Sequence, residues 1–224
     1  MERHLDTQIK GIKESLIKMA GLVESAIDKA IRALKDRDVD LAQKVMDEDG
    51  AINQLEIDVE IECRSLLARH QPVAVDLRFV MASTKINNDL ERMGDHAVNI
   101  AQKALALGKS RPIKPYIDIP YMAGIVQSMV KDSIDAFVEG DVAKAQNVCK
   151  NDDVVDGLEV QINRELITYM MEDPKNISQA LALSLVAKNL ERIADLSTNI
   201  GEEVIYMVEA KTIKHHFEDV HIKK

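Results

Sequence analysis

The sequence predicts an all-α protein made of two tandem, internally duplicated three-helix bundles, with six long antiparallel helices. Three observations favour this fold class. The apolar content comes mainly from aliphatic residues and Met, with 3% aromatics and no Trp, which suits helix packing better than sheet packing. The five prolines stand between long stretches of helical periodicity. Similar blocks of sequence recur about 100 residues apart.

Composition and charge exclude several classes of protein. Of the 224 residues, 46% are hydrophobic and 30% charged, enough apolar material for a core and no case for disorder. A net charge of −9 disfavours nucleic-acid binding, because phosphate backbones would repel the chain. Cys63 and Cys149 are far apart and form no metal or redox motif. With no secretory signal pattern and no apolar run of about 18 residues, we expect a cytoplasmic chain without direct membrane insertion.

Proline positions and periodicity predict the elements in order. We expect helices near residues 5–35, 39–69, 73–107, 121–139, 142–172 and 177–211. Pro72 and Pro174 each separate the last two helices of a group, and three prolines crowd the stretch between the groups. The expected division is a first bundle at 1–108, a linker at 109–120, a second bundle at 121–212 and a charged tail at 213–224.

A repeating pattern of apolar residues predicts the third and sixth helices. Apolar residues follow a 4-3-4-3 spacing in both, which is typical of helices packed in a left-handed bundle. The two seams are Ile86, Leu90, Met93, Ala97, Ile100, Ala104 and Leu107, and Val186, Leu190, Ile193, Ser197, Ile200, Val204 and Met207. The helices before them align as well, because residues 38–62 resemble residues 141–165 with a shift of 103. These matches indicate a duplicated three-helix unit.

Each seam helix also carries an acidic stripe. Glu91 and Asp95 are four residues apart, as are Glu191 and Asp195, so each pair shares one helical face. This face is expected roughly opposite the apolar seam. A single stripe of this kind is more often a solvated polar face than a binding site.

The second helix supplies a facing stripe in the first half. Asp49, Asn53 and Glu56 flank its apolar seam. Folding the hairpin antiparallel about the proline places Glu91 level with Asn53 and Asp95 level with Asp49. The two stripes are therefore expected to form one cluster.

The second half repeats the arrangement. Asp152, Asp156 and Glu159 occupy the positions on the fifth helix that match the first stripe. Folding this hairpin sets Glu191 and Asp195 level with Asp156 and Asp152. Both halves thus predict a carboxylate cluster at the same place.

Carboxylates gathered at one level repel one another unless a cation lies between them. Oxygen ligands suit hard cations such as Mg²⁺, Mn²⁺ or Ca²⁺, and iron where several carboxylates bridge metals. We therefore expect a divalent or ferric metal site in each half, with Fe, Mn, Mg and Zn open as the metal. A solvated acidic face stays open as the alternative.

Catalytic signatures are missing from the sequence. The single Glu-x-x-His pair, Glu218 and His221, falls in the charged tail, and His96 is expected to be a surface histidine. No phosphate-binding loop or nucleophile elbow occurs. We expect no catalytic residues, and hence no enzyme. A metal-dependent phosphohydrolase and a purely structural helical adaptor remain the alternatives.

Residues 69–78 read Arg-His-Gln-Pro-Val-Ala-Val-Asp-Leu-Arg, and a Leu-Glu-Arg-Met-Gly-Asp block follows at 90–95. These runs, with the second Leu-Glu-Arg-Ile-Ala-Asp block at 190–195, resemble the signature of the PhoU family over essentially the whole chain. The resemblance implies two three-helix bundles with metal clusters at E(D)-x3-D motifs. The matching pairs are Glu91 with Asp95, Glu191 with Asp195, and Asp152 with Asp156. Asn53 departs from the pattern, so the first site is expected to be weaker or to hold fewer ions.

The resemblance also implies a function. Such a protein regulates phosphate uptake negatively, between the ATPase of a phosphate ABC transporter and a phosphate-sensing histidine kinase. A homodimer is left open as a further assembly. For Asp76, Arg78 and Lys85 we expect structural roles, with contact to a partner protein as the alternative. In the structural role Arg78 would pair with acidic residues of the adjoining helix. Residues 173–178 do not repeat the first half's run, so the halves need not share partners.

Overall fold

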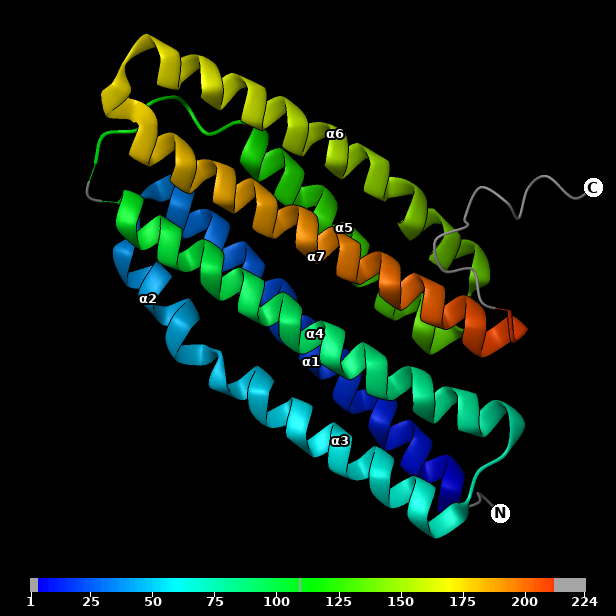
Figure 1. Ribbon diagram of the computed structural model, residues 1–224. Coiled ribbons are helices and arrows are strands. Elements are labelled where there is room, and N and C mark those ends of the chain that lie inside the picture. The colour runs from blue at the N-terminus through cyan, green and yellow to red at the C-terminus, as the bar shows by residue number, and fades with distance from the viewer. Residues whose placement is uncertain (1–3, 109, 212–224) are drawn as a thin grey trace, which may run out of the picture.

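The computed structural model describes residues 4–108 and 110–211, and within them it is helical with no strand (Figure 1). The elements are α1 (His4–Asp36), α2 (Val39–Glu48), α3 (Gly50–His70), α4 (Ala74–Leu107), α5 (Asp118–Glu139), α6 (Val142–Glu172), the 3₁₀ turn η1 (Pro174–Asn176) and α7 (Ile177–Glu209). The expected all-α fold class is confirmed. The predicted tail at 213–224, with Glu218 and His221, lies outside the described residues.

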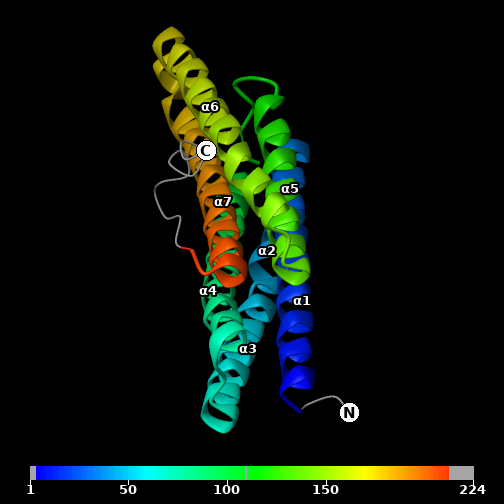
Figure 2. The same ribbon diagram turned by 90° about the vertical axis from the view of Figure 1, so that its right-hand side faces the viewer.

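The two groups of helices pack side by side along their length. α4 and α7 form one layer, and α1 and α5 lie behind them, as the turned view shows (Figures 1 and 2). On the buried side the rings of Phe79 and Phe137 stack with centroids 5.4 Å apart. The seam residues of α4 and α7 are buried, and the cores of the two halves form one continuous cluster. The halves are therefore bundles with a shared core.

One expected helix is broken in two. The sequence predicted a single helix over 39–69, whereas α2 ends at Glu48 and α3 begins at Gly50. Glycine costs about 1 kcal/mol relative to alanine inside a helix, so a break is least costly there. The equivalent residue in the other half is Asp153, and α6 runs through it without interruption.

The same turn begins the second helix of each half. Arg37 and Gly140 both adopt positive φ angles, of 60° and 68°. The residue that follows is an aspartate in each case, and its side chain caps the next helix. Asp38 accepts a hydrogen bond from the Leu41 amide at 2.9 Å, and Asp141 accepts one from the Lys144 amide at 3.0 Å. Identical caps at matching positions support the duplication.

The segment that connects the two halves forms polar contacts with both of them. Arg37 donates to the carbonyl oxygen of Gly108 at 2.9 Å. Lys114 is buried and forms ion pairs with Asp118 and Glu165. Helix α5 begins at Asp118, three residues earlier than expected. Within the described residues no helix is both long and apolar enough to cross a membrane.

Candidate metal centres

The register of the first hairpin brings the predicted stripes together. The Asn87 amide donates to the Glu56 carbonyl oxygen at 2.8 Å, which sets these residues level. Farther along, a Cβ atom at Gly94 would lie 3.6 Å from Asp49 Oδ1. Asp49 is therefore level with residues 94–95 of α4, so the predicted register is confirmed.

The second hairpin has the matching register. The Ser184 hydroxyl donates to Asn163 Oδ1 at 2.6 Å, and the Cys149 thiol donates to the Thr198 carbonyl oxygen at 3.9 Å. These pairs place Asp152 level with Asp195, as predicted. The two halves thus hold equivalent clusters, one between α3 and α4 and one between α6 and α7.

Both clusters lie deeper than expected. The sequence placed the acidic stripes on a face opposite the apolar seam, open to solvent. Among the nine carboxylates of the two clusters, Asp95 and Asp156 are exposed, but the other seven are half-buried. The stripes turn toward the groove of each hairpin because the second helix packs against the flank of the seam helix. The buried carboxylates therefore lose part of their hydration.

In the first cluster, burial raises the pKa of Glu91, and the nearby charges of Asp95, Glu56 and Asp49 raise it further. The Asn53 amide donates to Asp49 Oδ2 at 2.9 Å. Asp49 Oδ1 and Asn53 Oδ1 are buried and have no hydrogen-bond partner among the described residues. All five residues predicted for this site are thus brought together.

In the second cluster, burial and then the charges of Asp195, Asp156 and Glu191 raise the pKa of Asp152 to about 7. Burial also raises the pKa of Asp156 and Asp195. Within the described chain, Asp152 Oδ1 and Glu191 Oε2 are buried without a hydrogen-bond partner. Carboxylates that repel one another and leave buried oxygens unsatisfied are placed to gain from a bound cation.

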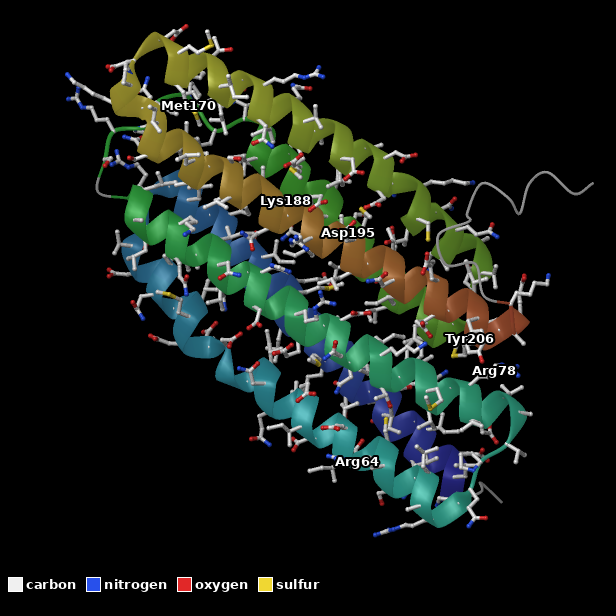
Figure 3. All side chains as sticks on the ribbon, in the orientation of Figure 1. Arg64, Arg78, Met170, Lys188, Asp195 and Tyr206 are labelled. Atoms are coloured by element: carbon white, nitrogen blue, oxygen red, sulfur yellow. The ribbon has the colours of Figure 1, made fainter. Side chains whose placement is uncertain are left out.

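Glu159 lies at the edge of the second cluster. The Asn163 amide donates to Glu159 Oε1 at 2.7 Å. The Lys188 ammonium, one turn before Glu191, reaches Glu191 Oε1 at 2.7 Å. Lys188 and Asp195 both lie along the middle of α7 (Figure 3).

The donor set fits a hard cation, although the side chains do not converge on one. It consists of carboxylate oxygens and one amide oxygen, the ligands that Mg²⁺, Mn²⁺ and iron accept. Four of these oxygens are buried and have no hydrogen-bond partner among the residues that the structure describes. In the conformations seen, no three His, Cys, Asp or Glu side chains of residues 4–108 and 110–211 are placed to hold an ion. Binding would require side-chain rotations within each groove.

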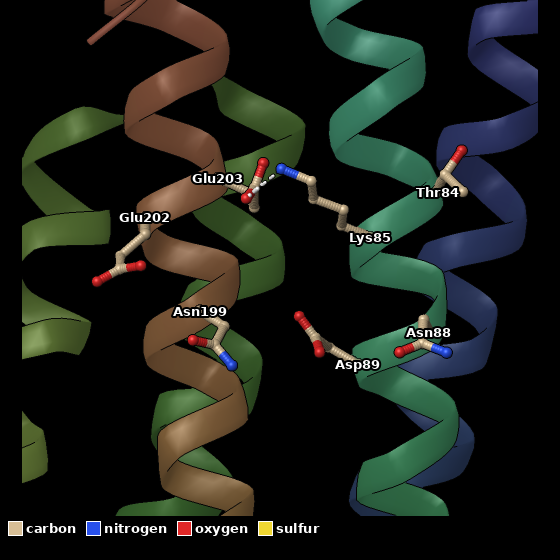
Figure 4. Close-up of a pocket in the computed structure, with 7 residues that line it drawn as sticks. All are labelled: Thr84, Lys85, Asn88, Asp89, Asn199, Glu202 and Glu203. Carbon is tan, nitrogen blue, oxygen red and sulfur yellow. Dashed lines mark hydrogen bonds and ion pairs between the residues drawn. The ribbon is translucent and has the colours of Figure 1, made fainter. Parts of the chain in front are cut away.

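A polar cleft between α4 and α7 was not foreseen from the sequence. Its volume is about 470 Å³. Figure 4 shows the side chains of α4 and α7 that line it. Its lining consists of Thr84, Lys85, Asn88, Asp89, Asn199, Glu202 and Glu203. Lys85 Nζ forms an ion pair with Glu203 Oε1 at 2.7 Å, joining the two halves. The signal in the sequence was the Glu202-Glu203 pair, which matches Gln102-Lys103 in the first half.

Two further contacts join the halves, and both correct an expectation. His96, expected at the surface, is partly buried and hydrogen-bonded through Nδ1 to Asn189 Oδ1 at 2.9 Å. Arg78 Nε donates to the Met207 carbonyl oxygen at 2.9 Å, rather than pairing with an acidic residue of its own hairpin. Both contacts arise because α4 and α7 are antiparallel neighbours, which periodicity within one half does not reveal.

The fold and sites define a class of protein: a duplicated helical bundle with one acidic cluster in each hairpin groove. A family model described as the PhoU domain matches residues 16–104 and again 119–204. The chain belongs to the PhoU family.

Relatives and solved structures agree with this assignment. The chain is 46% identical over 217 residues to a phosphate-specific transport system accessory protein PhoU homolog of Aquifex aeolicus, covering 97% of this chain and 96% of the relative. A Pseudomonas putida relative of the same name is 38% identical, with 96% and 84% covered. The crystal structure of PhoU from Pseudomonas aeruginosa has a TM-score of 0.90 at 39% identity, covering 93% of this chain and 100% of that one. The Streptococcus pneumoniae phosphate transport system regulatory protein PhoU gives 0.87 at 29% identity, with 94% and 100% covered.

Proposed function

We propose that the chain is a cytoplasmic negative regulator of phosphate uptake that acts by docking. It would couple the ATPase of a phosphate ABC transporter to a phosphate-sensing histidine kinase and restrain uptake when phosphate is plentiful. Family membership supports the role in phosphate transport, because the relatives carry the name of accessory proteins of that system. The repeats at 1–108 and 121–212 would act as the two docking units, and a homodimer stays open.

The observation that carries the proposal is the pair of equivalent carboxylate clusters. Neither stripe lies in the apolar core, and both contain buried oxygens without partners among the described residues. We propose that each cluster binds divalent or ferric ions. A bound ion would neutralise the clustered charge and hold the two helices of a hairpin in one arrangement. The groups that would hold it are Asp49, Asn53, Glu56, Glu91 and Asp95 in the first site, and Asp152, Asp156, Glu159, Glu191 and Asp195 in the second.

A binding role suits the chemistry near the clusters better than catalysis does. Cys149 is the thiol nearest the second cluster, and burial, followed by the charges of Glu202 and Asp152, raises its pKa to about 12. The thiol therefore stays protonated at neutral pH and is a poor nucleophile. This supports a regulator that is not an enzyme.

A cellular experiment tests the proposal. Deleting the chain should derepress phosphate-uptake genes in phosphate-rich medium, and Asp95→Asn with Asp195→Asn should lose part of the repression. Exposed and half-exposed substitutions away from the core usually cost within ~0.5 kcal/mol, so helical content should stay nearly unchanged. Normal repression by a variant that binds no metal would show that the clusters are not needed for signalling. Hydrolysis of phosphoesters by the purified wild type, abolished by the same substitutions, would overturn the regulator in favour of a phosphohydrolase.

A further inference from the structure

The second cluster contains a cation of its own. Lys188 Nζ lies 2.7 Å from Glu191 Oε1, with the lysine side chain 44% exposed and the glutamate side chain 13% exposed. The pair joins residues three apart on α7, and the lysine side chain is the more exposed of the two. The other oxygen of this carboxylate, Glu191 Oε2, is buried and has no hydrogen-bond partner in the described parts of the chain.

The charge of Lys188 acts on four of the five carboxylates of the second cluster. The hydrogen bond with Glu191, and then the charges of Glu191 and Glu159, raise the pKa of Lys188. Burial and neighbouring carboxylates raise the pKa of Asp156 and Asp195, and the Lys188 charge opposes the rise in both. The ammonium therefore lies among carboxylates of both α6 and α7, where a metal ion would also be attracted.

The first cluster has no lysine at this place. Its equivalent residue is Asn88, which is exposed. The cation that acts on Glu91 is Arg92, the next residue along the helix. The halves differ at a second position as well, because Asp156 in the second cluster replaces Asn53 in the first.

These two differences offset one another. The first cluster holds four carboxylates, from Asp49, Glu56, Glu91 and Asp95. The second holds five carboxylates and the Lys188 ammonium, so both clusters carry a formal charge of −4. The ammonium thus balances the additional aspartate.

We propose that Lys188 is a tethered cation of the second site, and that a metal ion binds there by displacing its ammonium from Glu191. This inference rests on the proposed metal sites. Displacement is sterically simple, because the lysine side chain is half-exposed and can swing into solvent. Loading the second site would then release a positive charge at the surface of α7, whereas loading the first site would not. Metal binding would change the two halves differently.

Metal affinity tests the proposal. The experiment uses the chain with Asp95→Asn, which disables the first site. This chain is titrated calorimetrically with Mn²⁺, both with and without the further substitution Lys188→Asn. Asparagine is chosen because the first half has it at the equivalent position. We expect Lys188→Asn to tighten binding about three- to tenfold, as for removal of a competing, partly buried ion pair. Lys150→Asn is the matched control, since it removes an exposed lysine two residues before Asp152 and should change affinity less than twofold. In the chain with Asp195→Asn, Asn88→Lys should weaken the first site by a similar three- to tenfold.

A second readout follows the ammonium directly. Wild-type chain is treated with an amine-acetylating reagent, with and without saturating Mn²⁺, and modification is measured by mass spectrometry. Acetylation of Lys188 should rise severalfold with metal, whereas acetylation of Lys150 should not. Unchanged acetylation of Lys188 at saturation, or equal affinities with and without Lys188→Asn, would overturn the displacement while leaving the metal sites intact. Failure of every variant, Lys188→Asn included, to bind Mn²⁺, Mg²⁺, Zn²⁺ or Fe³⁺ would overturn the metal sites and this inference together.

Discussion

Gly94 on α4 lies so close to Ile52 on α3 that a Cβ atom at the glycine would approach Ile52 Cδ1 to 3.1 Å. The same atom would lie 3.6 Å from Asp49 Oδ1, in the first cluster. At Gly201 on α7 the neighbour is backbone instead, with the Ala145 carbonyl oxygen 3.0 Å from an added Cβ.

We predict that these two glycines respond differently to alanine. In Gly94→Ala the Ile52 side chain can rotate, and the gain of about 1 kcal/mol in helix propensity offsets the strain, so the free energy of unfolding should change by less than ~1 kcal/mol. In Gly201→Ala the obstacle is the backbone of α6, and we expect a loss of ~1–3 kcal/mol. Urea unfolding measures both.

Gly157→Ala serves as the control for this comparison, because an added Cβ there meets nothing within 4 Å. It should stabilise the chain by about 0.5–1 kcal/mol through helix propensity alone. Equal costs for Gly94→Ala and Gly201→Ala would contradict the distinction between a movable side chain and a fixed backbone.

The sequence predicted most of the fold within each half. The apolar spacing through Leu90 and Leu190 predicted which faces are buried, and the prolines predicted the hairpin turns. The register that sets Asp49 beside Asp95 followed from helix geometry and antiparallel folding alone. The break at Gly50 was missed because one glycine in a helical pattern is usually tolerated.

Contacts between the halves could not be predicted in the same way. The pairing of His96 with Asn189, and of Lys85 with Glu203, depends on how α4 packs against α7. Periodicity identifies a helix face but not its partner, and two duplicated bundles can pack in several ways. Lys188 was overlooked for another reason, because oppositely charged residues three apart are common on solvated helix faces.

Capping gives a prediction that compares the repeats. Asp38→Ala and Asp141→Ala each remove a side chain that accepts a hydrogen bond at the start of a helix. Each should lower the free energy of unfolding by about 1 kcal/mol, and by similar amounts because the geometry is the same. Asp38→Asn and Asp141→Asn, which keep an accepting oxygen, should recover most of the loss in urea unfolding. A large loss of unfolding free energy in one half alone would contradict this prediction, because the two caps would then contribute unequally to stability.

The pH dependence of the metal-free chain should report Asp152. Its pKa is raised from 3.8 to about 7 in the folded protein, so the folded state holds a proton that the unfolded chain has lost. The resulting stabilisation is fully present below the unfolded pKa and is lost as the pH rises through about 7. The melting temperature of wild type relative to Asp152→Asn should therefore rise as the pH falls from 8 to 5, in the presence of chelator. A difference between the two chains that does not vary with pH would rule out the shift.

Metal addition should stabilise the two sites independently. A ligand that binds only the folded chain raises the free energy of unfolding, by about 2.7 kcal/mol at a ligand concentration 100 times Kd. The melting temperature rises as a result. With Mn²⁺, Mg²⁺, Zn²⁺ or Fe³⁺ we expect Asp95→Asn to retain the second site, Asp195→Asn to retain the first, and the double variant to lose both. Asp40→Asn, an exposed aspartate on α2, is the control and should respond like wild type, because it removes the same charge outside the clusters. If the melting temperature of the wild type is unchanged by all four metals, the acidic stripes are solvated faces and docking has to be explained without an ion.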